Sequence, residues 1–331
     1  MIPDIWVIIL TSLLTFLSAK FYILFFKRIL KKSFVPTGFG ISLSLTLLIG
    51  FFFNRQDEYI YSLTPCVIFI LIGSLIYFLD DIYSLSPIIR MSISSIVSLL
   101  IVENGFRVEF LSIENLLYLL VISIVLIITI GLVNVFNFYD GADLNLTSLI
   151  FLTGLILKIF NTESLLLYTL LGSILIGYSI GFGLINRKPK HLYLGDSGSF
   201  SIALLFVTLL LSSYFKSIPI FIHLLALISF PIFDVFYVLL IRVYFSHNLL
   251  SRNYLHLYQR LNIEKQNFNY LIPVVFNFLI FIIFKNIFII IGFPIFLASS
   301  ISIFLFTPLN YLSLRYFLVK KKYFFGDGKN E

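Results

Sequence analysis

The stretch IYSLTPCVIFILIGSLIYFLDDIYSLSP, residues 60–87, contains the pattern that decides the fold. Residues 60–79 are almost all apolar, and a run of about 20 such residues matches the hydrocarbon thickness of a bilayer. Two adjacent aspartates, Asp80 and Asp81, end the run before a turn-forming LSP segment. A carboxylate beside a membrane segment is costly unless it binds a cation or forms a pair. The stretch therefore predicts a membrane helix that ends in a functional acidic pair.

The rest of the chain repeats this apolar pattern. Its 331 residues are 60% hydrophobic and 12% charged, with a mean hydropathy of +1.04. We predict an all-α polytopic membrane protein with about eleven transmembrane helices, forming a single catalytic domain over residues 1–331. The expected spans are 4–26, 39–53, 60–79, 88–102, 115–133, 146–160, 164–185, 199–214, 217–241, 269–284 and 286–308, with a turn at Lys285-Asn286. The single cysteine, Cys66, excludes an intramolecular disulfide and a cysteine-ligated metal site.

Basic residues divide unevenly between the loops that alternate along such a chain. Seventeen Lys and Arg residues fall in one set of loops and four in the other. The richer set is expected in the cytoplasm, which places the N-terminus outside and the C-terminus inside. It comprises approximately 27–38, 80–87, 134–145, 186–198, 242–268 and the basic tail 315–331. These loops explain the net charge of +7 without a nucleic acid as partner, and every acidic cluster lies on their side.

The first acidic motif is the Asp80-Asp81 pair. Adjacent aspartates repel each other unless a cation lies between them and a phosphate, and hard oxygen ligands of this kind suit Mg²⁺. Arg90, which follows the LSP turn, is placed to face a phosphate. The alternative is a solvated aspartate pair at a helix end.

The second motif places Asn134, Asn137, Asp140 and Asp143 at the end of the fifth span. Spacings of three suit one face of a helical turn. Amides and carboxylates together can hydrogen-bond a nucleobase or a sugar and hold a metal. The alternative is a set of N-caps for the next helix, but four polar residues at regular spacing exceed what a cap needs.

The third motif, GDSGS at residues 195–199, opens the eighth span. The N–H groups at a helix N-terminus favour anions, and Asp196 is placed to ligate a metal that a phosphate also binds. Upstream, Asn186 contributes to a polar entry and Tyr193 offers a ring for stacking. Taken alone, the motif is only a good helix cap.

Two further groups lie toward the C-terminus. In the 242–268 loop, Arg252 and His256 are residue types that bind phosphate, and a histidine can also shuttle a proton. A lone histidine is more often a bystander than a catalyst. Asp234 lies inside the ninth span, where a carboxylate is a functional candidate, with helix packing or pairing to Arg242 as equal alternatives.

In this order, the motifs DDxxxLSPxxR, NxxNxxDGxD and GDxGS and a histidine-bearing loop resemble the polyprenyl-phosphate N-acetylhexosamine-1-phosphate transferases. The bacterial phospho-MurNAc-pentapeptide translocase belongs to the same superfamily. The resemblance runs from about residue 36 to 261 and includes PTGFG at 36–40, which is similar to that family's N-terminal Pro/Gly-rich motif. It implies eleven spans and an active site on the cytoplasmic face of the bacterial inner membrane.

The resemblance also implies roles for individual residues. Asp80, Asp81, Asp196 and His256 would be catalytic, with one of the paired aspartates acting as base. Asp196 and Asp81 would ligate Mg²⁺, with Mn²⁺ as an alternative. The substrate contacts would be Asn134, Asn137, Asp140 and Asp143 along the nucleotide sugar, Asn186 and Tyr193 at its uracil end, and Arg90 and Arg252.

The chain departs from the family pattern in three places. Residues 36–40 lack the usual arginine, and Leu144 stands where a glycine commonly follows Asp143. The last motif, LHLYQRL, has one histidine in place of a cluster. This ending is similar to members that initiate O-antigen (lipopolysaccharide) and capsule polysaccharides, and it argues against the peptidoglycan enzyme.

The expected reaction transfers a HexNAc-1-phosphate from a UDP-sugar to undecaprenyl phosphate and releases UMP. The partners are then these two substrates and membrane lipid, and a homodimer is left open. A phospho-MurNAc-pentapeptide translocase is the alternative enzyme. A transporter is the rival from another class, but the acidic residues cluster at one face and no repeat is visible. A CDP-alcohol phosphotransferase lacks support, because its DGxxAR signature is absent.

Overall fold

The computed structural model describes residues 4–29, 35–83, 85–107, 115–140, 144–187, 192–246, 255–264 and 271–319, and most of them are helical. No strand occurs in this described part, so the predicted all-α class is confirmed. Nine of the described helices are long and apolar enough to cross a membrane, and two shorter apolar helices accompany them. The protein is therefore a polytopic membrane protein.

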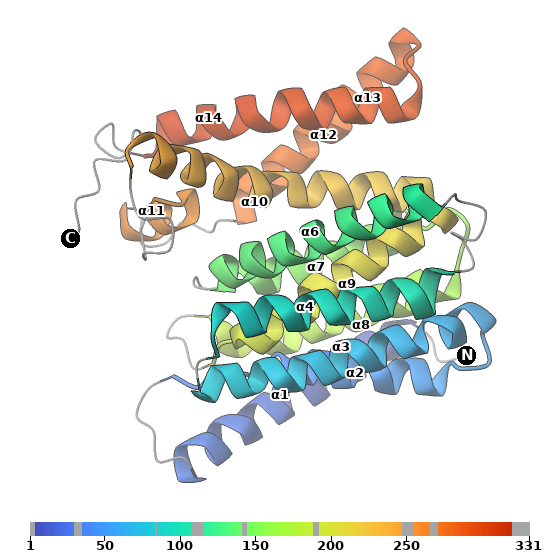
Figure 1. Cartoon of the computed structure of the whole chain (residues 1–331), viewed down its shortest axis with the longest axis vertical. Coiled ribbons are helices and arrows are strands. Elements are labelled where there is room, and N and C mark those ends of the chain that lie inside the picture. Colours follow the sequence, from blue (N-terminus) through green and yellow to red (C-terminus); the bar gives the residue numbers. More distant parts are fainter. Residues whose placement is uncertain are drawn as a thin grey trace. The chain divides into compact units, whose positions relative to one another are not determined.

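Figure 1 shows the helices coloured in chain order. They are α1 (Asp4–Ile29), α2 (Ile41–Phe53), α3 (Glu58–Tyr83), α4 (Pro87–Ile101), η1 (Val102–Phe106), α6 (Asn115–Asp140), α7 (Asn145–Ile159), α8 (Leu166–Asn186), α9 (Gly195–Lys216), α10 (Ile218–Tyr244), α11 (Leu257–Glu264), α12 (Leu271–Ile291), α13 (Ile295–Ile301), η2 (Ser302–Phe306) and α14 (Thr307–Leu318). The π-helical turns η1 and η2 extend the α-helices before them, so that Pro87–Phe106 and Ile295–Leu318 are each of membrane-crossing length. The number of apolar helical segments therefore matches the eleven predicted spans, although the last predicted span, 286–308, begins inside α12.

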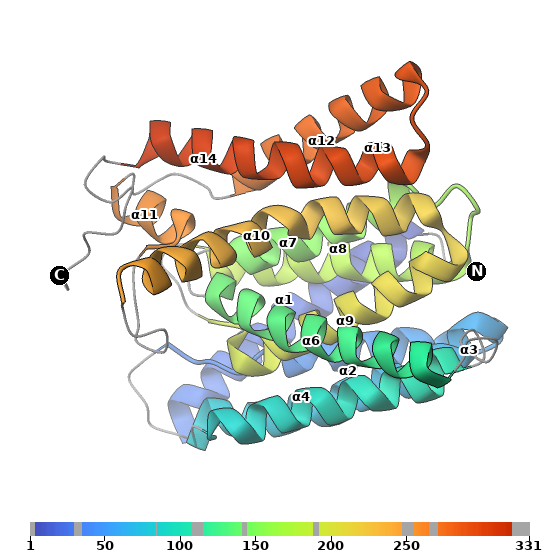
Figure 2. The same ribbon diagram turned by 45° about the horizontal axis from the view of Figure 1, so that its top comes forward.

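The chain forms two compact units, which are described separately. Unit 1 is Met1–Phe221 and unit 2 is Ile222–Glu331. A single catalytic domain stays a prediction for the whole chain. In unit 1, α9 packs against α3 and α6, whereas α8 packs against α1 and α7 (Figures 1 and 2). The C-terminal ends of α3 and α6 meet the N-terminus of α9, and this meeting brings the acidic motifs together.

Small residues allow α1 and α8 of unit 1 to pack closely. Gly177 and Gly181 of α8 lie one turn apart, and a Cβ at either position would fall against the backbone of Ile8 or Ser12 in α1. In a membrane, where lipid is as apolar as the side chains, such close backbone packing is a main source of helix association. The two glycines therefore fix α1 against α8.

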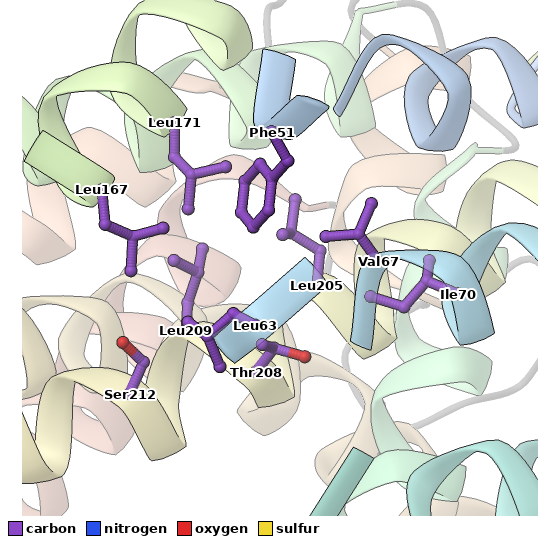
Figure 3. Close-up of a pocket in the computed structure, with 10 residues that line it drawn as sticks. All are labelled: Phe51, Leu63, Val67, Ile70, Leu167, Leu171, Leu205, Thr208, Leu209 and Ser212. Carbon is purple, nitrogen blue, oxygen red and sulfur yellow. The ribbon is translucent and has the colours of Figure 1, made fainter. Parts of the chain in front are cut away.

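A small apolar cavity lies between α2, α3, α8 and α9 of unit 1 (Figure 3). Its walls are Phe51, Leu63, Val67, Ile70, Leu167, Leu171, Leu205, Thr208, Leu209 and Ser212. The first half of α3 and the second half of α9 line it, so it is far along both helices from Asp80 and Asp196. No charged side chain lines the cavity, and it offers no group that could act on phosphate.

Unit 2 is held by a buried polar network between α10, α12 and α14. Asn310 Nδ2 donates to Asn277 Oδ1 at 3.1 Å, and Ser229 and Thr307 share a hydrogen bond of 3.1 Å. Asn277 Nδ2 lies 3.5 Å from the Ser229 hydroxyl and 3.4 Å from that of Thr307. Polar contacts of this kind join helices in an apolar medium, where no water competes for them.

The predicted turn at Lys285-Asn286 is wrong. α12 continues to Ile291, and the chain turns at Gly292, whose φ is +105°, before Pro294 precedes α13. Lys285 stays inside the helix because its ammonium has partners in unit 2: Nζ lies 3.2 Å from His223 Nε2 and 5.6 Å from the Phe281 ring centroid. A glycine able to adopt a positive φ, followed by a proline, is the stronger turn signal.

Several helices also extend past their predicted ends. α3 reaches Tyr83 and α6 reaches Asp140, while α9 begins at Gly195. The polar residues that end each apolar run therefore lie within the terminal helical turns. Asp80 and Asp81 are part of α3, and Asn134 and Asn137 are part of α6.

Candidate active site

Carboxylates from two other helices cap the N-terminus of α9. The Gly195 N–H donates to Asp140 Oδ2 at 2.7 Å, the Asp196 N–H to Asp81 Oδ1 at 2.9 Å and the Ser197 N–H to Asp81 Oδ2 at 3.2 Å. The first N–H groups of a helix have no partner within it, and the helix dipole favours negative charge there. The anions that these N–H groups bind are thus the side chains of α3 and α6.

Glycine is required where this cap forms. Gly195 has a φ of +77°, and a Cβ on it would press on the Asp81 carboxylate and the Gly38 N–H. Gly40 is in such close contact with Gly198 that a Cβ would overlap its Cα. The GDSGS glycines therefore serve close packing of protein backbone.

The PTGFG segment, residues 36–40, lies against the residues that precede α9. The Tyr193 N–H donates to the Pro36 carbonyl at 3.0 Å, and the Gly40 N–H donates to the Leu194 carbonyl at 2.9 Å. The Tyr22 hydroxyl holds the same segment from α1 through a 2.6 Å hydrogen bond to the Thr37 carbonyl. This segment thus supports the GDSGS turn from outside.

Asp80 makes a different set of contacts from Asp81. Its Oδ1 accepts a short hydrogen bond from the Leu85 N–H, which closes the turn between α3 and α4. Arg90 Nη1 lies 3.5 Å from Asp80 Oδ2 and 3.6 Å from Asp196 Oδ2. The Asp80 side chain is only 3% exposed, whereas those of Asp196 and Arg90 are 25% and 33% exposed. One guanidinium therefore bridges a buried and a solvent-accessible carboxylate.

The pair of Asp80 and Asp196 fits a hard cation. Among the described residues, no group of three or more His, Cys, Asp or Glu side chains is arranged to hold a metal ion. Mg²⁺ needs fewer, because it keeps several waters and is bound through one or two carboxylates together with substrate phosphates. Asp80 Oδ2 is buried and makes no hydrogen bond within the described part, and Asp196 is open to solvent. Asp81 as a metal ligand stays a prediction, since both of its oxygens already accept an N–H.

Asn186 joins three segments near this site. Its Oδ1 accepts from the Leu144 N–H at 3.0 Å and lies 3.2 Å from the Thr147 hydroxyl, while Nδ2 donates to the Leu192 carbonyl at 2.9 Å. The residue is 2% exposed. Asn186 therefore fixes the ends of α7 and α8 and the approach to α9, and its contact with a uracil stays a prediction.

Tyr193 is half-buried between this approach and Asp140. Burial raises the pKa of its hydroxyl, and the nearby Asp140 carboxylate raises it further. The hydroxyl consequently stays protonated at neutral pH and can donate a hydrogen bond. Its role in stacking a base is untested.

Asn134 and Asn137 lie one turn apart on an exposed face of α6. Asn134 Nδ2 donates to the Ile130 carbonyl of its own helix at 2.8 Å. Neither amide contributes to the cap of α9, which takes only Asp140 from this motif. The remaining predicted contacts, Asp143 and Arg252, lie outside the described residues.

His256 belongs to unit 2, where it directly precedes α11. It is 3% exposed, and its Nδ1 lies 3.5 Å from Asp234 Oδ2. For Asp234, the sequence left helix packing and pairing to Arg242 as equal alternatives. In the structure its carboxylate contacts His256. Asp234, Tyr311 and Arg315 form a cluster that the sequence pattern did not predict, because Asp234 lies 77 residues from Tyr311 along the chain and such a separation carries no signal.

The fold and site define a class: a polytopic membrane protein whose carboxylates gather where apolar helices end. Residues 61–214 match the profile of glycosyl transferase family 4, and this segment contains Asp80, Asp81, Asp140 and Asp196. Over this segment the chain is similar to that family, as its motifs led us to expect.

Two curated relatives agree with this assignment. The chain is 26% identical over 194 residues to a probable undecaprenyl-phosphate N-acetylglucosaminyl 1-phosphate transferase of Bacillus subtilis (strain 168), covering 55% of this chain and 53% of the relative. It is 28% identical over 176 residues to a phospho-N-acetylmuramoyl-pentapeptide-transferase of Prochlorococcus marinus (strain MIT 9515), covering 45% and 48%. The chain thus spans about half the length of the curated relatives that it matches.

Proposed function

We propose that this protein transfers an N-acetylhexosamine-1-phosphate from a UDP-sugar to a polyprenyl phosphate. The observation that carries the proposal is the meeting of Asp80, Asp81 and Asp196 with Arg90 at the ends of apolar helices. Such a site handles phosphate at the edge of a membrane, where a lipid-borne phosphate and a water-soluble nucleotide can meet. Both relatives are named as sugar-phosphate transferases, which supports the same reaction class.

In the proposed reaction, an oxygen of the lipid phosphate attacks the phosphorus that carries the sugar. A new P–O bond forms there, and the bond from this phosphorus to the phosphate oxygen of UMP breaks. One pyrophosphate is exchanged for another, so positioning and charge neutralisation account for most of the catalysis. The acceptor's long tail stays in lipid while its head reaches the site.

Each side chain of the site has a separate task in this proposal. Asp80 and Asp196 would hold Mg²⁺, with Mn²⁺ as a substitute, and the ion when bound neutralises pyrophosphate charge. Arg90 contacts a phosphate oxygen from its position between the two carboxylates. Asp81 and Asp140 hold the start of α9, and so set the position of Asp196. By the family resemblance, His256 would bind phosphate.

The membrane setting of the proposal follows from charge. We propose that the site lies on the cytoplasmic face of a bacterial inner membrane, with the C-terminus inside, an orientation that the basic loops favour. A reporter fused to the C-terminus tests this orientation, and a periplasmic signal would refute it.

The sugar is the open part of the proposal. The single histidine of LHLYQRL favours the initiation of a surface polysaccharide such as O-antigen, whereas one relative is named for the MurNAc-pentapeptide of peptidoglycan. A donor panel decides between these, because UDP-HexNAc donors and UDP-MurNAc-pentapeptide yield different lipid products.

The test is UMP release by purified protein in nanodiscs with undecaprenyl phosphate, Mg²⁺ and this donor panel. Asp196→Asn is expected to abolish turnover while the protein remains inserted and folded. Glu103→Gln is the matched control, because Glu103 is an acidic residue at the opposite end of the α4–η1 helix from Arg90 and its carboxylate contacts Arg107 and Tyr118. Failure with every donor by folded protein, or full activity of Asp196→Asn, would overturn the proposal.

A further inference from the structure

Asp234 is a carboxylate that the proposed reaction does not use. It lies within α10 and is 0% exposed. Its Oδ1 accepts the Tyr311 hydroxyl at 2.6 Å and the Leu257 N–H at 3.0 Å. Its Oδ2 makes no hydrogen bond in the described part and lies 3.5 Å from His256 Nδ1. Buried carboxylates are costly, so a second oxygen directed at an imidazole calls for an explanation.

The backbone on both sides of His256 is held by the same cluster. The Leu255 carbonyl accepts from Arg315 Nη1 at 2.9 Å, and the Leu257 N–H is bound to Asp234. The His256 carbonyl accepts the Arg260 N–H at 3.0 Å as α11 begins. The ring stacks on that of Tyr258, with centroids 5.7 Å apart. Side chains of α10 and α14 in unit 2 therefore hold the backbone of His256 in place.

Tyr311 and Arg315 stabilise the Asp234 carboxylate: Tyr311 donates to it, and Arg315 donates to the Tyr311 hydroxyl. Arg315 is fully buried, with its guanidinium 3.1 Å from the Tyr311 hydroxyl and 4.9 Å from the Tyr237 ring centroid. A cap for α11 needs only Asp234 Oδ1, which already binds the Leu257 N–H. The cap therefore does not explain why Oδ2 faces His256 Nδ1.

A carboxylate beside Nδ1 determines which nitrogen of an imidazole carries the proton. With Nδ1–H directed at the carboxylate, neutral histidine keeps its lone pair on Nε2. The carboxylate also fixes the plane of the ring. Asp234 and His256 have the arrangement that produces these effects.

We propose that Asp234 is a positioning residue that fixes the orientation and the tautomer of His256. The inference rests on the proposed function, in which His256 acts at the phosphate region. Asp234 itself touches no substrate. Its effect passes through Nε2 of His256.

The decisive variant is Asp234→Asn, because it has the same shape as aspartate. The amide oxygen can still accept from Tyr311 and Leu257, but an NH₂ group replaces Oδ2 and turns the imidazole to the opposite tautomer. We expect kcat to fall about 10- to 100-fold with KM for the donor unchanged. Tyr311→Phe removes a hydrogen bond from the same carboxylate without changing Oδ2, and should keep activity within about threefold.

A double-mutant cycle separates positioning from structural support. If Asp234 acts through His256, the variant Asp234→Asn/His256→Gln is no slower than His256→Gln alone. Losses that multiply in the double variant, or an Asp234→Asn enzyme with wild-type kcat, would refute the proposal.

A spectroscopic readout keeps this test independent of the reaction. The chain has four histidines, so ¹⁵N-histidine NMR with His256→Gln as the assignment reference can resolve the ring nitrogens of His256. Asp234→Asn should move the proton of His256 from Nδ1 to Nε2. An unchanged tautomer would overturn the inference even in active protein. A switched tautomer in protein that releases no UMP would reject the proposed function alone.

Discussion

Replacement of Asp81 tests whether this residue acts as a cap for α9. In Asp81→Ala, the N–H groups of Asp196 and Ser197 lose their acceptors at 2.9 and 3.2 Å. A buried donor left without a partner costs about 1–3 kcal/mol, so two such donors cost roughly 3 kcal/mol or more. Since 1.4 kcal/mol is a factor of ten, we expect these amides to exchange with solvent about 100-fold faster.

The assay is hydrogen–deuterium exchange by mass spectrometry in nanodiscs, read on a peptide that covers residues 194–198. Asp81→Asn should give about a tenfold increase, because its amide offers one oxygen acceptor for two N–H groups. Asp80→Ala is the matched control, since Asp80 is the adjacent acid but accepts from Leu85. Equal exchange in Asp80→Ala and Asp81→Ala, or no change in Asp81→Ala, would refute the capping argument.

Three further predictions use UMP release and thermal stability. Gly195→Ala should lower turnover at least tenfold, because a positive φ costs a residue with a side chain about 1–2 kcal/mol and the new Cβ would press on Asp81. Gly131→Ala is the control and should leave turnover unchanged, because a Cβ there meets nothing within 4 Å. Removal of divalent ions with EDTA should stop UMP release and added Mg²⁺ should restore it, whereas full turnover in EDTA would reject the metal site. Asn277→Leu should lower the melting temperature by the equivalent of about 1–2 kcal/mol with activity kept, and Phe276→Leu on the exposed side of the same helix should not.

The apolar pattern predicted most of the fold because bilayer thickness sets the length of each run. All eleven runs became helices, including the short α2 and α7. The errors concern helix ends, where a polar residue was taken as the start of a loop. Asp80 and Asp140 remain helical since their carboxylates find partners, and Lys285 remains helical beside His223. Composition alone cannot reveal such partners.

The candidate site was predictable in part for a similar reason. The motifs indicated the acidic residues and Arg90, and the structure brings Asp80, Asp196 and Arg90 together. It was not predictable that Asp81 would cap a helix more than 110 residues away, because this depends on which helices pack together. One signal was present: Leu194, the residue before α9, has no side chain able to cap it, so the cap had to come from elsewhere.

The cap that Asp81 and Asp140 form on α9 also changes how the site can bind phosphate. The GDSGS motif suggested that the N–H groups of α9 would bind a substrate phosphate, but Asp140 and Asp81 already occupy the first three. A phosphate approaching these carboxylates would meet negative charge unless a cation intervened. Arg90 and a metal on Asp80 and Asp196 are the groups that can supply positive charge here. In the proposed function, the adjacent aspartates thus have different tasks: Asp80 acts with Arg90 toward the phosphate, and Asp81 caps the helix that carries Asp196.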